Sequence, residues 1–227
     1  MYSQKHNFIF IHIPKTAGNS IQSVLSDYCD DDIFSISELA SMGEAGEEYK
    51  SIDSPIFEVR GEITPSKHAW LYQYFIALEG MDFDEISIFS CIRNPIHRAL
   101  SFYFSPHRWY KKNITSGVLE HEEPYWDEEA FLKLLPSITP MHKHLIIKDR
   151  YLKSKKHPEV KLIRYENIEN DFLQVMTDLN LPVSITLQKM NTSRYQGDYQ
   201  KILDNSALCT LVADHFKTDM DMYNYSL

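Results

Sequence analysis

A short run of small and polar residues has the composition of a loop that holds an anion. It consists of Lys15, Thr16, Ala17, Gly18, Asn19 and Ser20. An apolar stretch, Phe8–Ile13, precedes it, and apolar residues at helical spacing follow within Ile21–Leu25, which predicts a buried strand, a tight loop and a helix. Backbone N–H groups can close around an anion there, because the residues are small, and the helix dipole and Lys15 add positive charge. We therefore expect a phosphate or sulfate site.

The order of residues in this loop differs from that of the common nucleotide-binding loop. In that pattern, G-x-x-x-x-G-K-[ST], the lysine follows the glycines and a hydroxyl beside it serves magnesium. Here Lys15 precedes Gly18. This difference disfavours a magnesium-dependent kinase but leaves an anion site intact.

A second pair of residues has the chemistry to bind a phosphate. Arg93 ends an apolar stretch, Ile86–Ile92, which predicts a central strand, and Pro95 marks the start of a helix. Ser101 lies eight residues after Arg93, about two helical turns on. A guanidinium at the end of a strand and a hydroxyl on the next helix can hold one phosphate from two sides.

Both segments resemble motifs of the sulfotransferases that use 3′-phosphoadenosine 5′-phosphosulfate (PAPS), in the carbohydrate-type, family 2-like branch. The loop resembles P-K-T-[AG]-G-[TN]-[ST], which binds the 5′-phosphosulfate. The segment from Arg93 resembles R-[ND]-P-x-x-R-x-x-S-x-Y, which binds the 3′-phosphate. The resemblance continues over nearly the whole chain. Arg164–Phe172 resembles the family's YENLxxDF segment, and Met190–Arg194 resembles its N-x-S segment. Asp219–Tyr225 resembles the closing D-x-x-x-[FY]-x-Y pattern.

This resemblance implies a reaction and a set of site residues. The sulfuryl group of PAPS would pass to an acceptor hydroxyl, with a saccharide as the expected acceptor and with no metal. Lys15 and the loop N–H groups would stabilise charge on the leaving phosphate oxygen. Arg93 and Ser101 would bind the 3′-phosphate, and Ser193 and Arg194 would join them in binding the cofactor.

Two residues compete for the role of the general base that must take the acceptor proton. His68 lies in Ser66–Ala69, which resembles the branch's [KH]-H-x-[TS]-A stretch, and its unperturbed pKa of ~6.5 suits a base near neutral pH. Glu62 lies just past the predicted strand Ile56–Val59, and other branches of the family use Glu. We favour His68 and keep Glu62 as the alternative.

Two other functions remain open from the sequence. A small-molecule kinase is one, which nucleotide-dependent stimulation by magnesium would indicate. A non-catalytic protein that binds adenosine bisphosphate is the other, which tight nucleotide binding without turnover would indicate.

Composition narrows the class of protein. The chain has 227 residues and a formal net charge of −9, so it is a poor general binder of nucleic acid. No apolar run approaches the ~20 residues that a membrane span needs, and the polar N-terminus predicts no signal peptide. Cys29, Cys91 and Cys209 lie far apart, in neither a metal nor a disulfide spacing, so we expect a cytoplasmic protein. The sequence does not specify an oligomeric state.

Strands and helices that alternate along the chain must position these residues. We expect one domain, 1–227, of the α/β class, with a mostly parallel central sheet flanked by helices and the P-loop-NTPase-like sulfotransferase fold that the resemblance implies. Strands are predicted at Phe8–Ile13, Ile56–Val59, Ile86–Ile92 and Val160–Arg164. Helices are predicted after Ser20 and Pro95, and at Ser66–Leu78, Phe131–Tyr151, Asp171–Leu179 and Asp204–Phe216. The aromatic stretch Ser105–Glu129 is expected either to lie over the site, where the rings of Ser105–Trp126 could stack on sugars, or to be an ordinary surface insertion. His142 and His144 are expected to be surface residues and not metal ligands.

Overall fold

A computed structural model of the chain describes residues 1–29, 56–59, 62–65, 67–78, 83–112, 119–147, 157–182, 187, 195, 197 and 199–227. The chain divides into two compact units. The first comprises Met1–Ile92 and Lys143–Gln188, and the second comprises Arg93–His142 and Lys189–Leu227. The expectation of a single domain stays a prediction.

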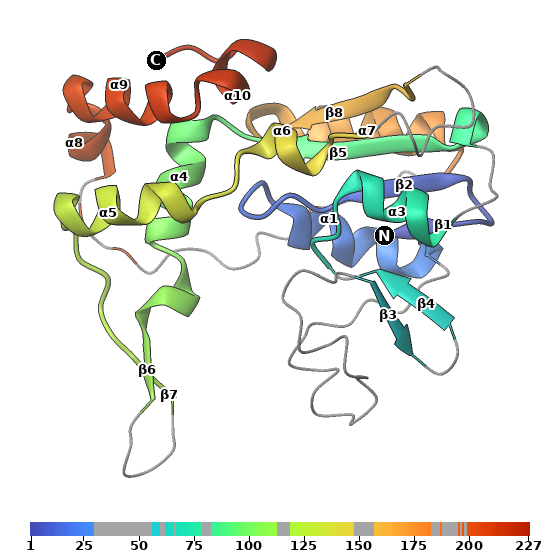
Figure 1. Cartoon of the computed structure of the whole chain (residues 1–227), viewed down its shortest axis with the longest axis horizontal. Coiled ribbons are helices and arrows are strands. Elements are labelled where there is room, and N and C mark those ends of the chain that lie inside the picture. Colours follow the sequence, from blue (N-terminus) through green and yellow to red (C-terminus); the bar gives the residue numbers. More distant parts are fainter. Residues whose placement is uncertain are drawn as a thin grey trace. The chain divides into compact units, whose positions relative to one another are not determined.

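The first unit is built on a four-stranded sheet (Figure 1). Its strands, in the order β1-β2-β5-β8, are Tyr2–Ser3, Phe8–Ile11, Ser87–Ile92 and Val160–Arg164. The last three are parallel, with Phe10 opposite Phe89 and Cys91 opposite Ile163, whereas β1 is antiparallel to β2. The mostly parallel sheet of the α/β class is therefore confirmed, with β5 between β2 and β8.

Helices cover this sheet because its central strands are apolar on both faces. Phe8, Phe10 and Phe89 are fully buried in a cluster with residues of α1 (Gly18–Leu25) and α7 (Ile168–Asp178). Burial of each such side chain contributes about 1.5–3 kcal/mol. In Figure 1, α7 lies behind β8, and α3 (Leu71–Ala77) lies in front of β2. Single-turn 3₁₀ segments accompany these elements at Ser26–Tyr28, Phe83–Glu85 and Tyr165–Asn167.

Two local expectations in this unit have different outcomes. The strand β3 (Ile56–Val59) is confirmed with its predicted bounds, and it pairs antiparallel with β4 (Glu62–Pro65) in a separate two-stranded sheet. The second expectation is wrong. The helix expected from Ser66 begins only at Leu71, because the N–H of Trp70 bonds to Oε1 of Gln73 at 2.5 Å and so caps the helix there.

The second unit contains mainly helices around an aromatic core. Its helices α4, α5, α8, α9 and α10 span Pro95–Tyr103, Glu128–Leu134, Tyr199–Leu203, Ser206–His215 and Lys217–Met222. The short helix α6 (Met141–His144) crosses from this unit into the first. The strands β6 (Tyr110–Lys112) and β7 (Leu119–His121) of this unit pair antiparallel with each other. Two 3₁₀ segments lie at Pro106–Trp109 and Leu135–Ser137.

The aromatic stretch after α4 supplies part of that core. Trp109 is 7% exposed, and its indole N–H donates to the carbonyl of Tyr103 at 2.9 Å. Trp126 packs with its ring 5.3 Å from that of Tyr103, whereas Tyr125 is 62% exposed. The two tryptophans therefore stabilise this unit, and the stacking of this stretch on sugar rings stays a prediction. No helix within the described ranges is long and apolar enough to cross a bilayer.

Candidate functional site

The loop before α1 has an unusual backbone. Lys15 and Ala17 have φ angles of 67° and 71°, in the left-handed region that residues with a Cβ rarely adopt. Each such residue costs about 1–3 kcal/mol and persists where the surroundings fix it, commonly at ligand sites. Left-handed residues beside helical ones turn successive N–H groups into an anion-binding concavity. The loop therefore has the backbone that the sequence predicts for an anion site.

Hydrogen bonds within the loop hold this backbone. Thr16 is fully buried, and its hydroxyl donates to the carbonyl of Ile13 at 2.8 Å. The N–H groups of Ser20 and Ile21 donate to the carbonyl of Ala17, the N-cap of α1, which provides no side-chain cap. Because a helix leaves its first N–H groups without an intrahelical acceptor, this N-terminus presents donors to a ligand.

Gly18, the first residue of α1, lies against the ring of His12. A Cβ placed on Gly18 would fall 1.9 Å from Cδ2 of His12, well inside van der Waals contact. A side chain is therefore excluded at this position. The sequence reveals the glycine, but only the fold shows that a histidine ring occupies the space.

His68 is fixed by the same residue, His12. Its Nδ1 lies 3.1 Å from the carbonyl oxygen of His12, and the two rings meet edge to face with centroids 4.6 Å apart. Since a carbonyl can only accept, Nδ1 of His68 carries the proton in this bond. Its Nε2 therefore keeps the lone pair that a general base needs.

Both histidines are kept neutral at neutral pH. Burial holds the pKa of His12 well below its ordinary value, and the charges of His68, Lys67 and the N-terminus act in the same direction. His68 is an exposed residue, but the protein packed against one side of its ring desolvates it and so lowers its pKa. The hydrogen bond to His12 opposes this shift, and the charges of Lys67 and Lys15 add to it. Lys15 and His68 are thus electrostatic neighbours in the first unit, which brings together two of the predicted catalytic residues.

Three other predicted site residues fall where their side chains are outside the described part of the chain. Glu62 begins β4, and only its backbone, opposite Val59, is described. Ser193 and Arg194 lie outside the described residues altogether. Their roles stay predictions.

The predicted 3′-phosphate residues belong to the second unit. Arg93 follows β5 directly, and Ser101 lies on α4; both are half-buried. Asn94 is the N-cap of that helix, and its Oδ1 accepts from the N–H groups of Ile96 and His97 at 2.9 and 3.5 Å. Pro95 at the first helical position reinforces this start. The local fold thus sets Arg93 immediately before a well-capped helix.

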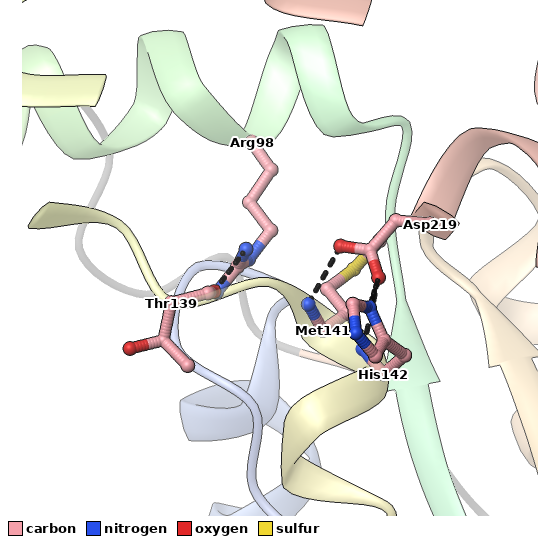
Figure 2. Close-up of polar contacts among 5 residues, drawn as sticks. All are labelled: Arg98, Thr139, Met141, His142 and Asp219. Atoms are coloured by element: carbon pink, nitrogen blue, oxygen red, sulfur yellow. Dashed lines mark hydrogen bonds and ion pairs between the residues drawn. The ribbon is translucent and has the colours of Figure 1, made fainter. Parts of the chain in front are cut away.

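A buried charged network in this unit was not predicted (Figure 2). Asp219 is fully buried and accepts from the N–H groups of Met141 and His142, at 2.6 and 2.9 Å, and from Nδ1 of His142 at 2.6 Å. Arg98 is 1% exposed and donates from Nη1 to the carbonyl of Thr139 at 3.0 Å. The sequence did contain a signal for this network. Arg98 is the second arginine of the R-[ND]-P-x-x-R-x-x-S-x-Y pattern, and Asp219 is the aspartate of the closing D-x-x-x-[FY]-x-Y pattern.

Opposite charge stabilises this network. Burial lowers the pKa of Arg98 to about 10, and the carboxylate of Asp219 opposes that shift, so Arg98 stays protonated at neutral pH. Burial and the Asp219 charge raise the pKa of Tyr223, so its phenol stays neutral. The guanidinium also lies 5.1 Å from the ring centroid of Phe102, one turn along α4.

His142 and His144 are not surface residues, contrary to expectation. His142 is 18% exposed in its side chain and bonds to Asp219, as described. His144 is 3% exposed, and its ring lies 5.4 Å from that of Trp70. Among the described residues, no group of three or more His, Cys, Asp and Glu side chains could hold a metal ion.

Comparisons with known proteins give one family match and one similar solved structure. A model of the "Sulfotransferase family" matches residues 1–226. Among solved structures, mouse sulfotransferase SULT7A1 complexed with PAP shares 15% sequence identity with a TM-score of 0.36. That match covers 83% of this chain and 62% of the mouse chain, so this chain spans less than two thirds of its length. No curated protein matches the sequence.

Proposed function

Because the chain belongs to the sulfotransferase family, we propose that it transfers the sulfuryl group of PAPS to an acceptor hydroxyl. The observation that carries this proposal is the backbone of the loop Lys15–Ser20. Its left-handed residues set a lysine beside the uncapped N-terminus of α1. This is a site for a strong anion, and in a sulfotransferase the anion is the phosphosulfate.

Lys15 acts on the leaving group in the proposed reaction. The acceptor oxygen forms a bond to sulfur while the bond from sulfur to the bridging phosphate oxygen breaks. Negative charge grows on that bridging oxygen, and the Lys15 ammonium and the loop N–H groups stabilise it. Adenosine 3′,5′-bisphosphate (PAP) then leaves.

His68 takes the acceptor proton at Nε2. The bond from its Nδ1 to the carbonyl of His12 supports this role, because it fixes the tautomer with the free lone pair. Its lowered pKa keeps the imidazole neutral at neutral pH, and therefore able to accept. Glu62 is the alternative base.

Arg93 and Ser101 bind the 3′-phosphate in this proposal, and Ser193 and Arg194 contribute further contacts. The capped start of α4 supports it, because the cap fixes the backbone next to Arg93. PAP should bind better than 5′-AMP, since a lost charge-assisted contact costs about 1.5–3 kcal/mol, or roughly tenfold to a hundredfold in affinity. Equal affinities in calorimetry would contradict the assignment.

A saccharide hydroxyl is the proposed acceptor. The support is the resemblance of the loop and of the Ser66–Ala69 stretch to the carbohydrate-type branch. Trp109 lies in the core and Trp126 packs against it, so these two rings add no support for sugar binding.

A transfer assay tests the whole proposal. The chain is incubated with PAPS carrying ³⁵S and a panel of oligosaccharides and small alcohols, with and without EDTA. We expect label on at least one saccharide, with EDTA making no difference. Transfer of phosphate from ATP with magnesium, and none of sulfate from PAPS, would replace the proposal with the kinase alternative. Tight PAP binding without turnover on any acceptor would favour the non-catalytic one.

A further inference from the structure

His12 is a buried titratable residue that the proposed reaction does not use. It follows β2 directly, is 4% exposed, and its Nδ1 is buried with no hydrogen-bond partner among the described residues. An unpaired buried nitrogen costs about 1–3 kcal/mol. The contacts of the ring and of the backbone carbonyl of His12 show what this residue can do for its neighbours.

The ring of His12 lies between the anion loop and the candidate base. On one side it fills the space next to Gly18, where a Cβ would be 1.9 Å away. On the other side its edge meets the ring of His68 at 4.6 Å between centroids, and its carbonyl accepts from Nδ1 of His68. Phe10 stacks behind it at 6.1 Å. The first residue of α1 and the base are thus in contact with one rigid ring.

We propose that His12 is a positioning residue that sets the base His68 relative to the anion loop through its ring and its backbone carbonyl. The proposal rests on the proposed function, in which His68 takes the acceptor proton. The carbonyl fixes the tautomer of His68, and the ring fixes its orientation and keeps water from one side of it. Misplacement of a reacting group by about 1 Å can lower the rate by about 10²-fold.

Two consequences distinguish this role from simple core filling. In addition to burial, the pKa of His12 is lowered by the charge of His68, by Lys67 and by the N-terminus, and, in addition to desolvation, the pKa of His68 is lowered by Lys67 and Lys15. The two lysines that act on His68 do not change when the His12 ring is removed. His68 is already an exposed residue, and the ring of His12 packs against one side of it. Loss of that ring removes part of the desolvation that lowers the pKa of His68, so this pKa should rise toward 6.5. An aromatic ring without nitrogen should keep the pKa low.

The test compares His12→Ala, His12→Phe and the wild type by ¹⁵N NMR titration of the imidazoles, with His68→Ala to assign the signals. Val175→Ala is the matched control, because it also removes buried volume in this unit but lies on α7. We expect the Nδ1–H tautomer in the wild type, an upward shift of the His68 titration in His12→Ala, and wild-type titration in His12→Phe and Val175→Ala. An unchanged titration in His12→Ala, or an Nε2–H tautomer in the wild type, would overturn the proposal.

A second readout separates this proposal from the proposed function. The NMR titration needs no substrate, so it stands even if no acceptor is sulfated. Where turnover is measurable, kcat should fall by up to about 10²-fold in His12→Ala and return in His12→Phe. If His12→Ala and His12→Phe both keep the normal kcat and the normal pH profile, His12 only fills space in the core, whatever reaction the protein catalyses.

Discussion

The two motif segments, Lys15–Ser20 and Arg93–Tyr103, present their functional residues in different ways. The first is a loop whose left-handed residues expose backbone N–H groups. The hydroxyl of Thr16 does not face a ligand, because it donates to the carbonyl of Ile13 inside the protein. The second is a regular helix, with Asn94 as its cap and Arg98 buried beneath it. The loop therefore offers mainly backbone to a ligand, whereas the helix offers side chains.

This difference shows that the residues of one motif have separate tasks. Thr16, Asn94 and Arg98 use their hydrogen bonds inside the protein. Lys15 and Arg93 are candidates to contact the cofactor. Substitutions should therefore fall into two groups, those that lower turnover or nucleotide affinity and those that lower stability.

The largest effect is expected at the base. His68→Ala should lower kcat by about 10²–10⁴-fold while PAP affinity holds, because proton removal is lost and binding is not. Activity of the wild type should rise with pH through an apparent pKa below 6.5, since the pKa of His68 is lowered. The measurement is kcat against pH in both proteins.

Glu62→Gln is the paired variant for this test. It should reduce turnover much less than His68→Ala does. Near-normal turnover in His68→Ala, together with an inactive Glu62→Gln, would move the base to Glu62.

The second effect concerns the helical unit. Asp219→Ala removes the acceptor of three hydrogen bonds and leaves Arg98 buried without its carboxylate, which should cost about 3–5 kcal/mol of unfolding free energy. Denaturant titration measures it. Asp221→Ala is the matched control: this exposed carboxylate pairs with Lys217 at 3.3 Å, and its loss should cost no more than about 0.5 kcal/mol. Similar costs in both variants would show that the network contributes little.

The third effect returns to the loop. Lys15→Ala should retain most PAP affinity but lose about 10²-fold in kcat, because the ammonium matters most as charge develops on the leaving oxygen. Lys5→Ala, an exposed lysine in the same unit, serves as the control. Weaker binding with intact kcat would make Lys15 an anchor for the nucleotide only.

The smallest effect is a pH dependence of stability. The unfolded chain binds a proton at His12 below pH ~6.5, whereas the folded chain does not, because its pKa is well below that value. Stability from this group is therefore complete above ~6.5 and falls as the pH drops below it, by at most about 1.4 kcal/mol per pH unit. His12→Phe should lack this loss, so the two unfolding curves should separate between pH 7.5 and 5.5. Parallel curves would contradict the buried, neutral state of His12.

Local sequence determined the elements that carry the motifs. The apolar, β-branched strands β2, β5 and β8 and the helices α1 and α4 were predicted from the runs and spacing of apolar residues and from Pro95, since these signals act within a few residues. The motif order also identified the family, which the match over residues 1–226 confirms. Lys15 and His68 were named on the same grounds.

Tertiary structure decided what those residues touch. The bond from His68 to His12 joins residues 56 positions apart, and Asp219 bonds to His142 across 77. Periodicity carries no information at such separations, so the placement of β3 in its own sheet and the burial of Trp109 and His142 were beyond it. The types of the chemical groups were thus fixed by the sequence, whereas the protonation of His68 and the burial of Arg98 depend on neighbours that only the folded chain brings within reach.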